Sequence, residues 1–409
     1  MKTNKLNKLF ILFLIWVFFL SGIIYADDID FEIDSSIETI SPQDTLPSIN
    51  SRAAIVYDRN SGMILYGKNE NEKRKMASTT KILTAIITIE NSTLSDIVTI
   101  SSKSAGTGGS RLGLHKDDKI SVADLLYGLM LCSGNDAAVA LAEHISGSVE
   151  NFAILMNQKA CEIGLNSSHF VTPHGLDDDN HYTTAYDLAL IMKQCIKNDV
   201  FKKILLTDKC TLPATELNSE ERIFQNNNSL IEKGDKYYYQ YCKGGKTGYT
   251  KEAKNCLVSY ASKDGMDLIA VVLKGETTET GESARNRDTI NLFEYGYNNY
   301  NLQTIKKKDE TVTSVEVKDN EGNTKQLKVK LENDIAVVNK DENKTQKDIK
   351  PEIDVNVENA PIEKGEVVGT ATYKINGEEY TSNLLIFVCN IFIMSVIFVV
   401  LRLNCNYIR

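Results

Sequence analysis

The sequence contains the stretch Met76-Ala77-Ser78-Thr79-Thr80-Lys81-Ile82-Leu83-Thr84-Ala85, whose spacing of serine, lysine and apolar residues predicts one central helix. Ser78 and Lys81 lie three positions apart, so on a helix they share a face, one turn apart. The segment 79–90 carries mostly apolar side chains at helical spacing. We therefore expect a buried helix that begins at or near Ser78, with the Ser78 backbone N–H pointing into a site.

A serine and a lysine at this spacing can carry out nucleophilic catalysis. A serine hydroxyl attacks poorly until a neighbouring group accepts its proton. Lys81 can accept that proton if burial and a second cation lower its pKa, and we expect Lys246 to be that cation. Taken alone, the motif also fits a helix N-cap at Ser78 and a solvated charge at Lys81.

A second motif, Ser133-Gly134-Asn135, lies between two helical patterns within the segment 122–142. We expect it at a helix–helix junction, with Ser133 relaying a proton between Lys81 and a leaving amine. Asn135 is predicted to hydrogen-bond a substrate peptide. The alternative is an ordinary turn in which Asn135 and Asp136 cap the second helix, and the two roles are compatible.

The third motif, Lys246-Thr247-Gly248, is predicted to lie on a strand that walls the same site. The stretches 237–241, 256–260 and 267–273 indicate successive antiparallel strands. Gly248 would let a substrate backbone approach closely. The N–H of Tyr249 is the expected second oxyanion donor, paired with that of Ser78.

The patterns S-x-x-K, S-x-N and K-T-G, in this order, form the signature set of penicillin-binding proteins and serine β-lactamases. Together with the stretches 131–138, 174–176 and 181–188, they make the chain resemble the D-alanyl-D-alanine carboxypeptidases, the low-molecular-weight penicillin-binding proteins. The resemblance covers nearly all of the chain after its leader. It implies removal of the terminal D-alanine from peptidoglycan stem pentapeptides through an acyl-serine intermediate, and covalent inhibition by β-lactam antibiotics.

The resemblance also assigns a role to each motif residue. The expected catalytic residues are Ser78 (nucleophile), Lys81 (general base) and Ser133 (proton relay). The expected substrate-binding residues are Asn135, Lys246, Thr247, Gly248 and Tyr249.

The chain departs from the family pattern at three places. Tyr249 follows K-T-G where some members have His. The stretch 225–230 contains no Arg, whereas some members use one there to hold the substrate carboxylate. Lys254-Asn255 replaces the small residues that commonly follow this turn, and the sequence assigns this pair no role. The sequence therefore does not define the affinity for the substrate's terminal carboxylate or the pH optimum of the reaction. The three departures do not affect the reaction class that the motifs indicate.

We expect an α+β fold with two domains. Residues 49–300 are predicted to form the catalytic domain, an antiparallel sheet with a helical cluster, as the resemblance to β-lactamases and penicillin-binding proteins implies. The sheet begins with a hairpin whose strands are 53–57 and 63–66. In residues 301–382, alternating apolar and polar side chains predict a small C-terminal β-sandwich without a catalytic constellation.

Both ends of the chain predict export and membrane attachment. Lysines followed by an apolar run at 9–20 indicate a signal peptide over 1–26, then a linker at 27–48; the alternative is an uncleaved N-terminal anchor. The segment 384–401 has no charge and is long enough to span a membrane, which leaves a cytoplasmic tail at 402–409. This predicts a protein held on the outer face of the cytoplasmic membrane. Family members often end instead in an amphipathic helix that lies on the membrane.

Composition argues against other kinds of protein. A net charge of −9 and a pI near 5.3 argue against nucleic-acid binding. The five histidines form no zinc motif, so no metal and no cofactor are expected. The eight cysteines do not indicate a disulfide framework in a chain of this length. Cys132, next to Ser133, is not the expected nucleophile.

Two other functions share these motifs. Glu162-Ile163-Gly164-Leu165-Asn166 matches the E-x-x-L-N element of class A β-lactamases, whose glutamate activates the deacylating water. A membrane-bound β-lactam sensor would also be acylated, but the tail predicted after residue 401 is too short for a cytoplasmic output domain. The carboxypeptidase is the preferred function. The sequence leaves open the stem-peptide diamino acid, the growth stage of use, the oligomeric state and the cysteine redox state.

Overall fold

The computed structural model describes residues 46–277, 283–318, 324–332, 334–340, 351–355, 367–375 and 378–387. The predicted signal peptide at 1–26 and cytoplasmic tail at 402–409 lie outside the described residues, as does most of the predicted linker at 27–48.

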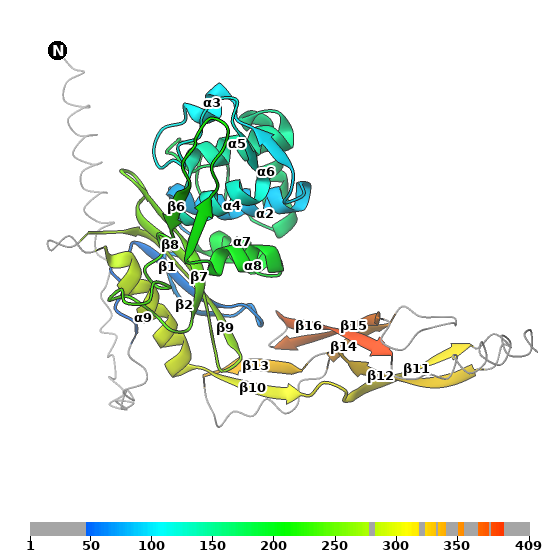
Figure 1. The fold of residues 1–409 in the computed structure, drawn as a ribbon. Coiled ribbons are helices and arrows are strands. Elements are labelled where there is room, and N and C mark those ends of the chain that lie inside the picture. Colours follow the sequence, from blue (N-terminus) through cyan, green and yellow to red (C-terminus); the bar gives the residue numbers. More distant parts are fainter. Residues whose placement is uncertain are drawn as a thin grey trace, which may run out of the picture. The chain divides into compact units, whose positions relative to one another are not determined.

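A five-stranded antiparallel sheet runs through the catalytic domain, with the strand order β2-β1-β9-β8-β7 (Figure 1). Its strands are β1 (Ala53–Asp58), β2 (Ile64–Lys68), β7 (Cys242–Thr250), β8 (Lys254–Lys263) and β9 (Met266–Gly275). The predicted hairpin is confirmed as β1 and β2, in which Ala54 pairs with Lys68. Because β7 lies at an edge of this sheet, alternate backbone groups of β7 point away from β8.

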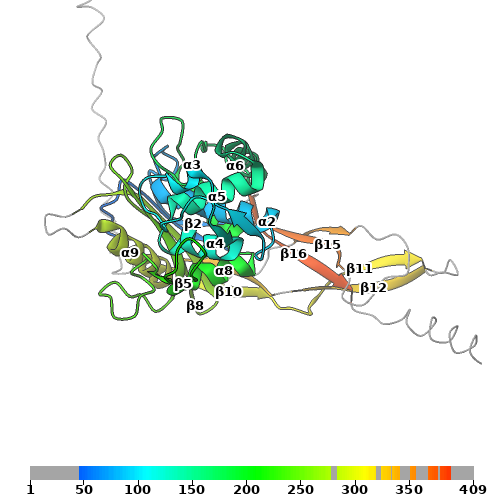
Figure 2. The same ribbon diagram turned by 45° about the horizontal axis from the view of Figure 1, so that its top comes forward.

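Apolar side chains alternate between the two faces of this sheet. Ile55 of β1 belongs to the hydrophobic cluster that contains Ile82 and the other core residues of the helical part. Its neighbour Ala54 belongs to a second cluster, with Phe293 of helix α9 (Ala284–Asn299). Figures 1 and 2 both show α9 on one side of the sheet and the remaining helices on the other. The sheet is therefore covered on both faces.

The helical cluster contains the first two motifs and two short strand pairs. The helices are the 3₁₀ turn η2 (Ala77–Thr80), α2 (Lys81–Asn91), α3 (Ser102–Ala105), α4 (Val122–Leu131), α5 (Asn135–Ser146), α6 (Val149–Ile163), α7 (Ala185–Cys195) and α8 (Asp199–Leu206). The strand pairs are β3 (Ile97–Thr99) with β4 (Lys119–Ser121), and β5 (Lys209–Leu212) with β6 (Arg222–Gln225).

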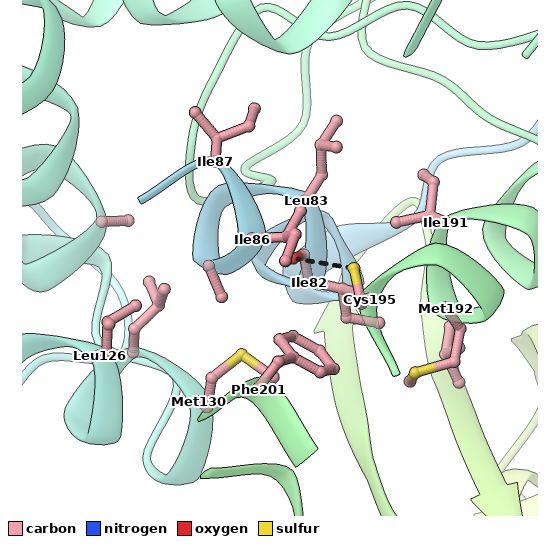
Figure 3. Packing of buried hydrophobic residues seen from close by; sticks show 14 of the residues in the cluster. Ile82, Leu83, Ile86, Ile87, Leu126, Met130, Ile191, Met192, Cys195 and Phe201 are labelled. Carbon is pink, nitrogen blue, oxygen red and sulfur yellow. Dashed lines mark hydrogen bonds between the residues drawn. The ribbon is translucent and has the colours of Figure 1, made fainter. Parts of the chain in front are cut away.

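Helix α2 is the core of this cluster. Its residues from Lys81 to Thr88 are all buried. Figure 3 shows its isoleucine and leucine side chains packed among Met130 of α4, Ile191 of α7 and Phe201 of α8. The predicted buried helix is thus confirmed, except that its first turn, η2, is a 3₁₀ helix. Packing on all sides of α2 fixes the position of Ser78.

The C-terminal region is β-rich, as predicted. Strand β10 (Asn301–Lys306) pairs with β13 (Ile335–Asn339). A second sheet has the order β11-β12-β16-β15-β14. Its strands are β11 (Thr311–Lys318), β12 (Thr324–Leu331), β14 (Pro351–Val355), β15 (Val367–Ile375) and β16 (Glu378–Phe387).

The predicted membrane-spanning segment at 384–401 overlaps this second sheet. Leu384 pairs with Thr370 of β15, and Phe387 pairs with Val329 of β12. The prediction was wrong for residues 384–387, because an uncharged apolar run suits a strand as well as a spanning helix. Residues 388–401 lie outside the described residues, and no helix among the described residues is long and apolar enough to cross a membrane.

Candidate active site

The three motifs meet around the amine of Lys81. Its Nζ lies 2.8 Å from Ser78 Oγ, 2.7 Å from Asn135 Oδ1 and 2.7 Å from the His174 carbonyl oxygen. The last two atoms can only accept hydrogen bonds. A neutral amine has two hydrogens, so both are donated to Asn135 and His174. The lone pair of the nitrogen is then left facing the hydroxyl of Ser78, which is the geometry that a general base needs.

Burial favours this neutral form of Lys81. The side chain is fully buried, and desolvation lowers the pKa of Lys81 well below its usual value. The charge of Lys246 lowers it further. Lys246 is itself buried, and desolvation lowers its pKa to about 7. When Lys246 is protonated, its charge therefore acts on Lys81 in the direction expected from the sequence.

Ser133 occupies the expected junction between α4 and α5. Its φ is 65°, in the left-handed region that few residues with a β-carbon adopt. The Ser133 hydroxyl is buried and has no hydrogen-bond partner among the described residues. A buried hydroxyl without a partner is rare, and such groups often have a catalytic role. This hydroxyl therefore has its hydrogen-bonding capacity unused by the described residues.

Asn135 is held more tightly than the sequence predicts. Its Oδ1 accepts from Lys81, and its Nδ2 donates to the Gly108 carbonyl oxygen at 2.7 Å. A β-carbon on Gly109 would lie 2.5 Å from the same Nδ2. One N–H of the amide is left for a substrate. Asn135 thus orients Lys81, and its predicted contact with a substrate peptide stays a prediction.

Asp136 has a role that the sequence did not reveal. The carboxylate is buried and accepts hydrogen bonds from the backbone N–H groups of Leu112, Gly113 and Leu114 at 2.9 to 3.2 Å. From the sequence, Asp136 was expected only as a helix cap. Here it also fixes the loop that precedes β4, across from Ser133. A carboxylate in the first turn of a helix, followed by a run of apolar residues from Ala137 to Ala142, was the only available signal.

Strand β7 packs one face against the Ser78 turn, because β-carbons on a strand point out of the plane of the sheet. A β-carbon on Gly248 would lie 3.0 Å from the Ser78 backbone nitrogen and 3.1 Å from the Met76 carbonyl oxygen. The close approach predicted for a substrate backbone is therefore already made by the protein's own chain. Tyr249 follows Gly248 and is 58% exposed.

His181 supports the Ser78 turn from behind. The N–H of Val171 donates to His181 Nδ1, so the proton of the neutral ring is on Nε2 and is donated to Thr80 Oγ1. The Thr80 hydroxyl in turn donates to the carbonyl oxygen of Ala77. Desolvation lowers the pKa of His181 to about 4, which keeps the ring neutral. His181 therefore has a structural role, holding the Ser78 turn through Thr80.

Comparison with known proteins assigns the chain that forms this site to a family. The family described as D-alanyl-D-alanine carboxypeptidase matches residues 39–277. The chain belongs to that family. The domain described as the C-terminal domain of penicillin-binding protein 5 matches residues 300–388.

Individual relatives cover both domains of this carboxypeptidase. D-alanyl-D-alanine carboxypeptidase DacF of Bacillus subtilis is 35% identical over 80% of this chain and 82% of its own length. Penicillin-binding protein 5 of Haemophilus influenzae is 29% identical, with a TM-score of 0.64 over 84% of this chain and 98% of its own. A peptidoglycan synthesis regulatory factor (PBP3) of Streptococcus pneumoniae is 26% identical, with a TM-score of 0.71 over 83% and 99%.

Arg285 is a further cation of this carboxypeptidase that the sequence analysis missed. It lies at the start of α9, and its charge lowers the pKa of Lys246. Its Nε is buried and has no hydrogen-bond partner among the described residues. The stretch 225–230 lacks the Arg that some family members have. No sequence pattern connects α9 with K-T-G.

Two residues that could have indicated another enzyme do not contribute to this site. Glu162 lies at the end of α6 with a side chain 65% exposed, and it forms an ion pair with Lys159 at 3.2 Å. A base for deacylation in a class A β-lactamase must instead lie in the site beside the serine. Burial raises the pKa of the Cys132 thiol to about 12, so its reactive thiolate is disfavoured.

Proposed function

We propose that this carboxypeptidase releases the terminal D-alanine from peptidoglycan stem pentapeptides through an ester on Ser78. The observation that supports this most directly is the Lys81 amine, which is buried beside the Ser78 hydroxyl with both of its hydrogens donated elsewhere. The names of the family and of its relatives supply the substrate class.

Acylation begins when Ser78 Oγ attacks the carbonyl carbon between the two terminal D-alanines. The hydroxyl proton passes to the lone pair of Lys81, and the negative charge on the carbonyl oxygen is stabilised by the N–H groups of Ser78 and Tyr249. The C–N bond then breaks. The proton moves from Lys81 through the Ser133 hydroxyl to the leaving amine, and D-alanine departs.

Deacylation repeats these steps with water. A water molecule gives its proton to Lys81 and attacks the ester carbonyl, and the proton returns to Ser78 Oγ as the C–O bond breaks. A β-lactam follows the same first step, with its ring nitrogen in place of the leaving amine. The ring nitrogen remains tethered to the acyl group, so the leaving group cannot diffuse away and the inhibitor stays bound to Ser78.

The terminal carboxylate of the substrate would lie toward Lys246 and Thr247. Arg285, and Lys246 when it is protonated, are cations in a poorly solvated environment, where attraction to a carboxylate is strong. We also propose that the protein is exported and that residues beyond 387 hold it at the membrane. The segment 388–401 continues the uncharged run.

The test is D-alanine release from a synthetic stem pentapeptide. The protein should release one D-alanine per peptide, and Ser78→Ala should release none. Release that persists in Ser78→Ala would contradict the proposed mechanism. For the anchor, resistance of the full-length protein to extraction by high salt or carbonate is expected, and complete extraction would contradict a spanning segment.

A further inference from the structure

A basic cleft of about 570 Å³ adjoins the catalytic motifs. Two of its walls are the residues just before the Ser78 turn and the turn just after β7. We call it the basic cleft and define it by the six cationic side chains that line it, which are Lys73, Arg74, Lys75, Lys251, Lys254 and Lys274. Only Asp179 and Glu252 line it with negative charge. This excess of positive charge is unusual in a chain whose net charge is −9.

Half of these cations have partners of their own. Arg74 pairs with Glu72 at 2.5 Å, Lys75 pairs with Asp179 at 3.8 Å, and Lys73 lies 4.7 Å from the centre of the Tyr182 ring. The partners of Arg74 do not satisfy its Nε, which is buried without a hydrogen bond among the described residues.

The other three cations are not compensated. Lys251, Lys254 and Lys274 form no ion pair within the part of the chain that the structure describes. Lys254 and Lys274 both have a φ of 55°, a left-handed conformation that glycine or asparagine adopts more easily than lysine. Such outliers often mark functional sites. Lysine at both positions retains two charges on the cleft at the expense of backbone strain.

The proposed mechanism fixes the direction in which the bound peptide runs along β7. The scissile carbonyl lies at Tyr249 and the terminal carboxylate lies toward Lys246. A peptide that pairs with the free edge of β7 must therefore run antiparallel to β7. Its residues upstream of the scissile bond extend past Thr250 toward Lys251. At about 3.3 Å per residue, two or three upstream residues span ~7–10 Å, which is enough to reach the turn after β7.

We propose that the basic cleft binds a carboxylate that the peptide carries two or three residues upstream of the scissile bond. This inference rests on the proposed function and adds a substrate preference to it: the enzyme selects acidic over neutral stem peptides. It also gives a role to Lys254, whose charge follows the K-T-G strand and lines the cleft.

The experiment compares three pentapeptides that end in D-alanyl-D-alanine. The first has free carboxylates on a glutamyl second residue and a diaminopimelyl third residue, the second is amidated on the glutamyl residue, and the third is amidated on the diaminopimelyl residue. The measured quantity is kcat/KM for D-alanine release. We expect kcat/KM to be about threefold to tenfold higher for the peptide with free carboxylates than for one of the two amidated peptides. The amidation that lowers kcat/KM identifies the residue whose carboxylate binds the cleft. The difference should shrink at high salt, because salt screens the charges.

The test variant is Lys254→Asn with Lys274→Asn, because asparagine tolerates a left-handed φ. The double variant should cleave the acidic and amidated peptides with equal kcat/KM. Its kcat/KM for the amidated peptide should equal that of the unmodified protein. Lys251→Gln, at an exposed position, should reduce the preference without risk to folding. Lys233→Gln, an exposed lysine outside the cleft, is the matched control and should keep the full preference.

The outcomes separate this inference from the proposed function. Equal kcat/KM for all three peptides in the unmodified protein, or an equal fall for acidic and amidated peptides in the variants, would overturn the cleft proposal while D-alanine release continues. Absence of D-alanine release from every peptide by the unmodified protein would contradict the proposed function instead. A fluorescent penicillin lacks the peptide carboxylate that the cleft is proposed to bind. Its rate of acylation should therefore be the same in all variants, which shows that the active site is intact.

Discussion

The amine of Lys81 lies 2.8 Å from the hydroxyl of Ser78, and hydrogen bonds to its other neighbours fix the orientation of the amine. Asn135 and the His174 carbonyl take its hydrogens at 2.7 Å each, so the lone pair faces the serine. Burial and Lys246 keep this amine neutral by lowering the pKa of Lys81. The reactivity of Ser78 thus depends on contacts that come from three separate segments of the chain.

Replacement of Lys81 by methionine should remove the base with little change in side-chain length. We expect the rate of acylation by a fluorescent penicillin to fall by about 10²–10⁴-fold, the usual contribution of a general base. Stopped-time gel fluorescence measures this rate. Lys116→Met, on an exposed loop, is the control and should be acylated normally. A Lys81→Met protein that is folded and acylated at the normal rate would exclude Lys81 as the base.

Replacement of Lys246 by glutamine should shift the pH profile of acylation. Loss of the neighbouring positive charge makes protonation of Lys81 easier, so the pKa of Lys81 rises. The acidic limb of the rate profile should therefore move to higher pH, whatever the change in maximal rate. Measuring the acylation rate between pH 5 and pH 10 tests this. Lys233→Gln should leave the limb in place, and an unshifted limb in Lys246→Gln would refute the coupling.

Gly175→Ala should damage the site through the Ser78 turn. A β-carbon on Gly175 would lie 1.9 Å from the Ala77 carbonyl oxygen, and the φ of this residue is +84°. Gly147→Ala is a matched control, because its φ is +77° but nothing lies within 4 Å of its β-carbon. Both variants should lose about 1 kcal/mol from backbone strain.

Only Gly175→Ala should lose more stability than this and be acylated more slowly, as thermal unfolding and penicillin labelling would show. Equal acylation of the two variants would mean that the packing of Gly175 does not hold the Ser78 turn.

His181 should make folding stability depend on pH. Its folded-state pKa of about 4 lies below its usual value of 6.5, so the unfolded chain binds the proton more readily. Stability is fully present above pH 6.5 and falls as the pH decreases toward 4, by about 3 kcal/mol if this ring were the only group that titrates. His181→Gln should reduce the loss of melting temperature between pH 7 and pH 4.5. An identical loss in both proteins would assign the acid sensitivity to other groups.

Much of this site follows from local spacing. The interval between Ser78 and Lys81, the junction at Ser133 and the strand at Lys246 each depend on neighbouring residues, and the structure has all three where local pattern predicts them. Contacts between distant segments leave no such pattern. The His174 carbonyl, the loop held by Asp136 and the approach of Arg285 arise only when the helices and the sheet pack together.

The end of the chain shows a second limit of local pattern. The apolar residues 384–387 fit both a strand and a spanning helix, and pairing with β12 and β15 decided for the strand. Gly248 shows the same limit within the site. The sequence predicts that another backbone approaches Gly248 closely. It does not predict that this backbone is the protein's own, at the Ser78 nitrogen.

Mapping the covalent adduct tests the central claim most directly. The protein is incubated with benzylpenicillin, digested and analysed by peptide mass spectrometry, beside Ser78→Ala treated in the same way. The account predicts one penicilloyl group, on Ser78, and none in Ser78→Ala. An adduct on Cys132 or on any other residue, or an adduct that persists in Ser78→Ala, would contradict it.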